Sequence, residues 1–325
     1  MCRHLAYLGP PKSLRELVLA PAGGLYEQAW RPRRQLNGTV NADGFGLGWY
    51  PEDDGDRDPG HAAGEAADRE PRPARYRRAV PIWGDANLPD LARSVRTRAL
   101  LAAVRDATPG TAPDESAAAP FRAPEPPGGP WLFSHNGAVP DWTALPADLA
   151  AVSSRAAALT PDALLALEAR SDSGLLWALL LNRLHSGEPL EAALPALCRE
   201  VLVVRPSARL NLLVTDGRSI AAVRRGDSLW YRAGRDSVLV ASEPDGEPDA
   251  ETDAEAGTGA REGGWREVPE GSLVLARPGE VAVRPLWVQE TASTAVPAEP
   301  SPAARLRSRP RTPATADRAQ GSPTP

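Results

Sequence analysis

The apolar residues of this 325-residue chain are divided among many short runs, and this division is the strongest constraint on its fold. The longest run covers only residues 175–181, far short of the roughly 18 to 20 apolar residues of a membrane-spanning helix. Most runs have the length and composition of strands, a few have helical periodicity, and the two kinds do not alternate regularly. The pattern argues against a membrane protein and predicts an α+β fold.

The expected elements follow from these runs. Strands are predicted at 3–8, 46–50, 100–104, 131–136, 210–215, 219–224, 229–232, 238–242 and 272–277. Helices are predicted at 13–19, 161–169, 173–184 and 190–201, and Asp172 lies where the first turn of the helix at 173–184 begins.

Three segments have few residues that could be buried. Residues 51–70 and 243–262 combine acidic side chains with Gly, Ala and Pro, and residues 288–325 combine Pro, Ala, Ser and Thr with scattered arginines. Such compositions are typical of solvated chain. We therefore expect an ordered domain at 2–287, exposed acidic loops near 51–70 and 243–262, and a disordered tail at 288–325, to which we assign no role.

Charge and cysteine content narrow the class of protein. The formal net charge is −5 and the pI is near 5.6, which argues against a nucleic-acid partner because such partners require a basic face. Two cysteines and four scattered histidines give neither a disulfide framework nor metal-ligand spacing, so no metal is expected. The apolar run after Arg3 is too short for a signal peptide, and we expect a cytoplasmic protein.

Cys2 is the first residue that could carry chemistry. A small second residue generally permits removal of the initiator methionine, which would leave Cys2 at the amino terminus. Its thiol and a free α-amine with a pKa of about 8 would then be a nucleophile and base on one residue. The alternative is a chance cysteine near the start of the chain.

Three further positions each have a functional and a structural interpretation. Asn136-Gly137 follows an apolar run and could form an oxyanion hole, although Asn-Gly is also a strong signal for a hairpin turn. Arg105 at a strand end could bind a carboxylate or form a surface ion pair. Asp172 could receive a substrate ammonium or cap a helix.

Several motifs, taken in order, resemble those of class II glutamine amidotransferases, which are N-terminal nucleophile (Ntn) hydrolases. They are 1–9 (MCRHLAYLG), 41–46 (NADGFG), 104–108 (VRDAT), 133–137 (FSHNG) and 171–173 (SDS). Residues 33–35 (RRQ), 38–40 (GTV) and 75–83 (RYRRAVPIW) are similar to one branch, the amidohydrolases of ergothioneine biosynthesis. The resemblance covers roughly residues 2–287, with Gly174 standing where this branch often has an acidic residue.

The resemblance implies a fold and a set of roles. The fold would be an αββα four-layer sandwich of two antiparallel sheets flanked by helices. Cys2 would attack a γ-glutamyl carbonyl, the Asn136 side chain and the Gly137 N–H would hold the oxyanion, and Arg105 and Asp172 would bind the α-carboxylate and α-ammonium. Residues 41–46 would lie beside the nucleophile. No organic cofactor is implied.

The resemblance leaves the leaving group of the reaction open. The branch implies hydrolysis of γ-glutamyl-hercynylcysteine sulfoxide, a small molecule with a quaternary ammonium, for which Trp30, Trp49, Trp83 and Tyr76 are candidate pocket walls. A glutaminase subunit that supplies ammonia to a separate synthetase would use the same glutamyl-binding residues. A non-enzymatic binding module is disfavoured because the whole constellation is present, and a homo-oligomer stays open.

Overall fold

The computed structural model describes residues 2–35, 38, 40–51, 72–107, 111, 114–123, 129–152, 159–246 and 263–287. Residues Met1–Trp287 form one compact unit. The predicted acidic loop at 51–70 lies outside the described residues except for Pro51, as do the predicted loop beyond residue 246 and the tail at 288–325. No helix in the described ranges is long and apolar enough to cross a membrane.

The first sheet has seven strands in the order β11-β9-β10-β1-β4-β2-β3, all paired antiparallel. Its strands are β1 (Arg3–Ser13), β2 (Phe45–Trp49), β3 (Ala74–Arg78), β4 (Arg96–Val104), β9 (Trp230–Ala233), β10 (Val238–Ala241) and β11 (Trp265–Glu267). Strand β1 is central and pairs with β10 on one side and β4 on the other. The start of the chain is therefore held on both edges.

The second sheet has six strands in the order β13-β12-β8-β7-β6-β5, also antiparallel. Its strands are β5 (Phe121–Arg122), β6 (Leu132–Ala138), β7 (Arg209–Thr215), β8 (Ile220–Arg224), β12 (Ser272–Arg277) and β13 (Glu280–Pro285). Strand β5 is short, and its described pairs with β6 extend only from Leu132 to Phe133. The later part of β6 is therefore not paired with β5.

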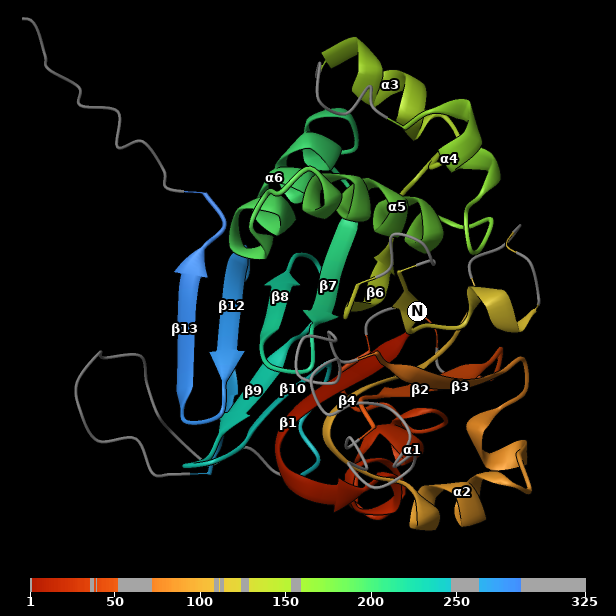
Figure 1. Ribbon diagram of the computed structural model, residues 1–325, viewed down its shortest axis with the longest axis vertical. Helices are drawn as coiled ribbons and strands as arrows, with labels where there is room; N and C mark the ends of the chain where they lie inside the picture. Colours follow the sequence, from red (N-terminus) through yellow and green to blue (C-terminus); the bar gives the residue numbers. More distant parts are fainter. Residues whose placement is uncertain are drawn as a thin grey trace, which may run out of the picture. The chain divides into compact units, whose positions relative to one another are not determined.

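Helices cover the outer face of each sheet, which gives four layers (Figure 1). The helices on the second sheet are α3 (Leu145–Val152), α4 (Pro161–Leu165), α5 (Asp172–His185) and α6 (Leu190–Val204). Those on the first sheet are η1 (Arg15–Leu19), α1 (Leu25–Gln28), η2 (Ile82–Gly84) and α2 (Leu88–Ser94), and a short turn η3 (Glu115–Ala117) lies near β3. The expected αββα sandwich is confirmed.

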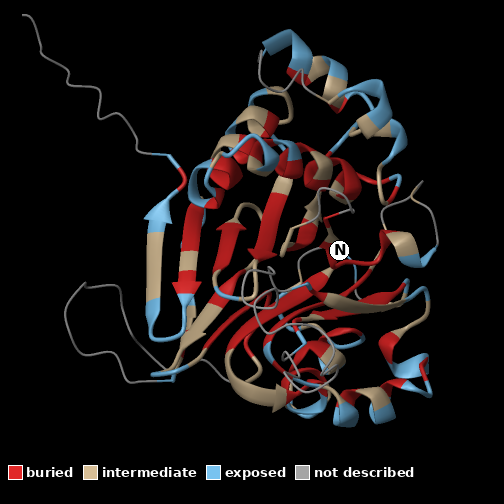
Figure 2. Ribbon diagram, viewed as in Figure 1, coloured by how far each residue is buried: buried red, intermediate tan, exposed pale blue. Residues whose placement is uncertain are grey.

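Three hydrophobic cores lie between the four layers. Which core a strand residue packs into depends on the face of the sheet to which its side chain points. Alternate residues of β1 point to opposite faces, so that Leu5 and Tyr7 pack with α1 and α2 while Ala6 and Leu8 pack between the sheets. The strands at the centre of the molecule are consequently buried on both faces, whereas the outer helices keep exposed sides (Figure 2). This double burial explains why the strands read as continuous apolar runs.

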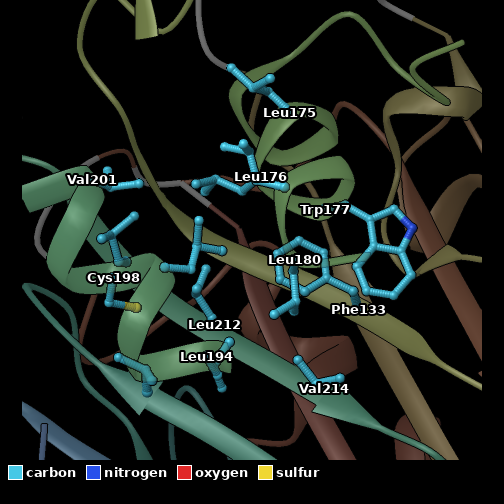
Figure 3. Close-up of a cluster of buried hydrophobic side chains, with 14 of the residues drawn as sticks. Phe133, Leu175, Leu176, Trp177, Leu180, Leu194, Cys198, Val201, Leu212 and Val214 are labelled. Atoms are coloured by element: carbon cyan, nitrogen blue, oxygen red, sulfur yellow. The ribbon is translucent and has the colours of Figure 1, made fainter. Parts of the chain in front are cut away.

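The third core lies between the second sheet and its helices. Side chains of α5 and α6 reach down onto β6 and β7, where the rings of Phe133 and Trp177 stack with centroids 5.2 Å apart (Figure 3). Cys198 of α6 is fully buried in this core, and burial raises the pKa of its thiol to about 12. Cys198 is therefore an inert packing residue.

All nine predicted strands are confirmed, with shifted ends, and four were missed: β3, β5, β11 and β13. Strand β3 is rich in arginine and β13 is an edge strand with charged residues, so neither shows a buried face. Strand β1 continues to Ser13 through a register irregularity between Leu8 and Lys12 that accommodates its prolines. The predicted helix at 13–19 is correspondingly wrong at its start.

The predicted helices at 173–184 and 190–201 are confirmed as α5 and α6, each extended by a few residues. The helix predicted at 161–169 is wrong at its end, because α4 stops at Leu165 and the chain turns before α5. The short helices α1, α2 and α3 were missed, since none is long enough to show a helical period.

Candidate active site

Cys2 lies immediately before β1, the central strand of the first sheet, and the residue is partly buried. The register pairs Arg3 with Val104, so the start of β1 lies beside the end of β4. Strand β2 begins at the same level, where its first residue, Phe45, faces Val104 of β4. The loops that follow β4 and precede β2 therefore meet at Cys2.

The electrostatic surroundings of Cys2 bring three of the predicted site residues together. Burial raises the pKa of the Cys2 thiol, while positive charge at the chain's amino terminus, a hydrogen bond with the Asp106 backbone and the Arg105 guanidinium act to lower it. The Asp172 carboxylate adds to the upward shift in pKa. The thiol is thus protonated at neutral pH and needs a base to become a nucleophile.

Arg105 is buried at the end of β4, with 6% of its surface exposed. The guanidinium donates to the Asp43 carbonyl at 3.4 Å and to Thr111 Oγ1 at 2.9 Å. Main-chain hydrogen bonds join its N–H to Gly44 and its carbonyl to Asp43. Residues 41–46 therefore hold Arg105 in place, and its burial contradicts the alternative of a surface ion pair.

Asp172 is the first residue of α5 and is also buried, with 5% exposed. Its Oδ2 accepts from the Val139 N–H at 3.0 Å and its Oδ1 from the Ser173 N–H at 2.7 Å. The helix cap is Ser171, whose hydroxyl accepts from the Gly174 N–H at 3.1 Å. The interpretation of Asp172 as the cap is therefore wrong.

Gly174, which departs from the pattern of the related branch, has a steric reason. A Cβ at this position would lie 2.2 Å from the Ala169 carbonyl oxygen. The turn before α5 approaches the helix too closely for any side chain. Glycine at this position therefore follows from the local backbone.

Asn136 and Gly137 lie inside β6, opposite Asn211 and Leu210 of β7, and the hairpin interpretation is wrong. Asn136 is fully buried and its carboxamide lies 3.3 Å from the Ser242 hydroxyl, on the side of the first sheet. The neighbouring His135 faces the helices, with Nδ1 3.0 Å from Ser173 Oγ and Nε2 2.9 Å from the Arg209 carbonyl. The Asn136 side chain therefore points toward Ser242 at the end of β10, the strand that pairs with β1.

The register also sets the direction of the Gly137 N–H. Leu210 donates its N–H to Arg225, on the β8 side of β7. Facing residues of an antiparallel pair exchange both hydrogen bonds or neither, so the Gly137 N–H points away from β7. Val139, two residues further, points the same way and donates to Asp172. The Gly137 N–H is thus directed to the edge of β6 where Asp172 lies.

Replacing Gly137 with alanine is expected to lower the free energy of unfolding by about 3 kcal/mol or more. The new Cβ would lie 2.0 Å from the Arg209 carbonyl oxygen, which cannot retreat without breaking the pairing of β6 with β7. Chemical denaturation measures the effect. The control is Gly84→Ala, whose Cβ would meet only Pro81 at 3.8 Å and should change stability by less than about 0.5 kcal/mol. Equal effects of the two variants would contradict this account of Gly137.

A buried ion pair, absent from the sequence prediction, fixes the strand that carries Cys2. Arg3 Nε lies 3.5 Å from Glu243 Oε1, with both side chains fully buried. Arg3 also donates to Gln35 at 3.0 Å, and Glu243 accepts from the Arg33 N–H at 2.8 Å. Removing one partner of such a pair strands a buried charge. Glu243 was predicted as the first residue of the exposed acidic loop at 243–262, and that prediction is wrong at its start, because Arg3 pairs with this carboxylate inside the domain.

Three of the predicted site residues, Cys2, Arg105 and Asp172, are thus joined by the described charges, and Asp172 accepts from the N–H of Val139, two residues after Gly137. Asn136 is linked to β1, the strand that follows Cys2, through the Ser242 hydroxyl, which also accepts from the His4 N–H. Among the described residues no group of His, Cys, Asp and Glu could hold a metal ion. The arrangement offers a thiol, a buried cation and a buried anion around one point, which suits a zwitterionic substrate.

Curated proteins with related sequences include hydrolases that act on a γ-glutamyl compound. The chain is 37% identical over 286 residues to a curated γ-glutamyl-hercynylcysteine sulfoxide hydrolase of Mycolicibacterium smegmatis, covering 88% of this chain and 100% of the relative. It is 34% identical over 274 residues to the protein of the same name from Mycobacterium tuberculosis, covering 84% and 92%. No family model matches the chain.

Solved structures with the same fold are more distant in sequence. A glutamine aminotransferase class-II domain protein from Silicibacter pomeroyi superposes with a TM-score of 0.54 at 22% identity, covering 88% of this chain and 100% of that one. The glutamine phosphoribosylpyrophosphate amidotransferase of B. subtilis gives 0.56 at 14% identity, covering 88% and 50%. At these identities the likeness concerns the fold.

The two-sheet sandwich is the fold of class II glutamine amidotransferases. The chain belongs to the family of the γ-glutamyl-hercynylcysteine sulfoxide hydrolases, as identities of 37% and 34% over 100% and 92% of two relatives show.

Proposed function

We propose that this protein hydrolyses the γ-glutamyl amide of γ-glutamyl-hercynylcysteine sulfoxide and releases glutamate and hercynylcysteine sulfoxide. The observation that carries the proposal is the 37% identity along the full length of a hydrolase of that name. The grouping of Cys2, Arg105 and Asp172 also supports the proposal. It provides a thiol for the attack, together with a cation and an anion that can pair with the two charges of a zwitterionic glutamyl group. Ergothioneine biosynthesis is the corresponding process.

Arg105 and Asp172 select the glutamyl half of the substrate. The Arg105 guanidinium binds the α-carboxylate through parallel N–H donors, and the Asp172 carboxylate binds the α-ammonium. Both side chains are more than nine-tenths buried and are oriented by backbone contacts before substrate arrives. Preorganised charges of this kind are strong because little water competes with the substrate.

Cys2 supplies the nucleophile after removal of Met1. Its freed α-amine takes the thiol proton as the sulfur attacks the γ-carbonyl carbon. The amide C–N bond then breaks, the leaving nitrogen takes that proton, and a glutamyl thioester remains on Cys2. The same amine next takes a proton from water, which attacks the thioester, and the regenerated thiol leaves glutamate free.

Asn136 and Gly137 stabilise the oxyanion in both steps. The Asn136 amide and the Gly137 N–H donate to the carbonyl oxygen as its negative charge develops. The direction of the Gly137 N–H, toward the edge of β6 where Asp172 lies, supports this role.

The leaving group carries a trimethylammonium, which favours aromatic faces. Trp30 and Trp83 are each about two-fifths exposed and their rings meet edge to face at 5.5 Å. Ala29, the chain neighbour of Trp30, accepts from the Asn41 N–H, in the segment that holds Arg105. Trp49 and Tyr76 instead pack against the first-sheet core. Of the four predicted walls, the exposed pair is therefore the better candidate.

The alternative is a glutaminase subunit that supplies ammonia to a separate synthetase. No contact described above distinguishes the two, because the glutamyl-binding groups would be identical. A cytoplasmic location, a small-molecule substrate without nucleic acid, and a possible homo-oligomer stay predictions of the sequence. The choice between the two functions depends on the leaving group.

Glutamate release from γ-glutamyl-hercynylcysteine sulfoxide and from glutamine, measured side by side with the purified protein, makes that choice. The expected result is a kcat/KM at least about 30-fold higher for the sulfoxide, since a desolvated contact of its trimethylammonium with aromatic faces is worth about 2 kcal/mol or more. A preference for glutamine would favour the ammonia-supplying subunit.

A further inference from the structure

We propose that Ser242 is a positioning residue whose hydroxyl donates to the carboxamide oxygen of Asn136 and thereby turns the amide nitrogen toward the substrate. The inference rests on the proposed role of Asn136 in the oxyanion hole and deepens it. Ser242 itself touches no reacting atom, and its effect on the reaction is exerted through Asn136.

Ser242 is held firmly at the end of β10. It is fully buried, and its N–H donates to the His4 carbonyl at 2.9 Å. Its hydroxyl accepts from the His4 N–H at 3.0 Å, and its carbonyl accepts from the Ser228 hydroxyl at 2.8 Å. These hydrogen bonds hold both the backbone and the side chain of Ser242, so the position of its hydroxyl oxygen is well defined.

The same hydroxyl bridges the two sheets. His4 is two residues after Cys2 on β1 of the first sheet, and Asn136 belongs to β6 of the second. Ser242 Oγ lies 3.0 Å from the His4 nitrogen and 3.3 Å from the Asn136 amide. One atom therefore sets the distance between the nucleophile strand and the oxyanion side chain.

Hydrogen-bond accounting decides which end of the carboxamide faces Ser242. With the nitrogen of Asn136 toward the hydroxyl, Ser242 Oγ accepts twice, and Asn136 Oδ1 is buried without a hydrogen-bond partner in the described part of the chain. The two ends of a carboxamide have the same shape, and the surrounding network selects between them. With the oxygen toward Ser242, the hydroxyl hydrogen and the oxygen satisfy each other.

This orientation places the Asn136 nitrogen in the buried position where the carboxamide oxygen would find no hydrogen-bond donor. A donor without a partner is costly in the free protein, and that cost is recovered when an oxyanion arrives. Donors that are fixed before the reaction and need no reorganisation are what an oxyanion hole requires. The orphaned position next to Ser242 is thus a feature of the site.

The test is a double-mutant cycle on the full-length protein, measured as glutamate release from the sulfoxide substrate. Asn136→Ala should lower kcat about 100- to 1000-fold. Ser242→Ala should lower kcat about 10- to 100-fold with KM changed less than about threefold, because a misoriented donor is worse than an oriented one but better than none. In the Asn136→Ala background, Ser242→Ala should cost less than about twofold.

Two further variants keep the test decisive. Ser228→Ala removes another serine hydroxyl bound to the same segment without touching Asn136, and its kcat should stay within about threefold of the parent. Ser242→Cys keeps the side-chain size but donates only weakly, and it should lose kcat even if the alanine variant fails to fold.

Three results would overturn the proposal: full activity of both Ser242 variants, an equal cost of Ser242→Ala with and without Asn136, or an equal loss in Ser228→Ala. Full activity of Asn136→Ala is a different result, which would refute the assignment of the oxyanion hole itself. The failure of the Ser242 inference and the failure of the proposed function are therefore distinguishable.

Discussion

Cys2→Ala is expected to lower kcat by about 10⁴-fold or more, which is the scale of losing the nucleophile in a covalent mechanism. No other described thiol can replace it, because Cys198 is fully buried in the core between α6 and the second sheet. Single-turnover glutamate release from the sulfoxide, followed over hours, measures the residual rate.

Cys198→Ala is the matched control for this variant. It removes the other cysteine from a packed core, so it should lower stability by about 1 kcal/mol and leave kcat within about twofold. Retention of more than a tenth of the activity by Cys2→Ala, or inactivity of a folded Cys198→Ala protein, would refute the assignment of the nucleophile.

The second large effect concerns the charges that select the glutamyl group. Asp172→Asn and Arg105→Met should each lower kcat/KM for the γ-glutamyl substrate about 100- to 1000-fold, because each leaves one charge of the bound substrate unpaired in a buried site. Both side chains are at most 6% exposed, so water cannot replace the lost partner.

Substrate analogues separate the two charges. A glutaryl amide lacks the α-ammonium, and Asp172→Asn should leave its hydrolysis rate nearly unchanged. A 4-aminobutanoyl amide lacks the α-carboxylate, and Arg105→Met should leave its rate nearly unchanged. Asp90→Asn breaks an exposed ion pair with Arg93 on α2 and should affect neither substrate. If Asp172→Asn lowered both analogue rates equally, its role would be structural and the assignment would be wrong.

The sequence predicted the sheets well because the strands are buried on both faces. Runs such as 210–215 show no polar alternation, and they became β7 with six of its seven residues buried. Edge strands gave no such signal. Strand β13 has only intermediate and exposed residues, and β3 is held by pairing with β2 and by ion pairs of Arg75 and Arg77 with Glu168. Those contacts are long-range and invisible in a local pattern.

Asn136-Gly137 shows where local reasoning fails in the site. The dipeptide favours a hairpin turn, yet it continues β6 because β7, more than 70 residues later in the chain, supplies the partner strand. Only the motif resemblance predicted its role. Ser242 and Glu243 had no signal beyond that resemblance, since their importance follows from contacts with His4 and Arg3 at the other end of the chain.

The central claim is that Cys2, exposed as the first residue, takes the glutamyl group. Acid quenching of the enzyme during turnover of the sulfoxide, followed by peptide mass mapping, tests it most directly. The expected product is an amino-terminal peptide that begins at Cys2 and carries the mass of a glutamyl acyl group on sulfur. A glutamyl group on any other residue, or an active enzyme whose first peptide retains Met1, would contradict it.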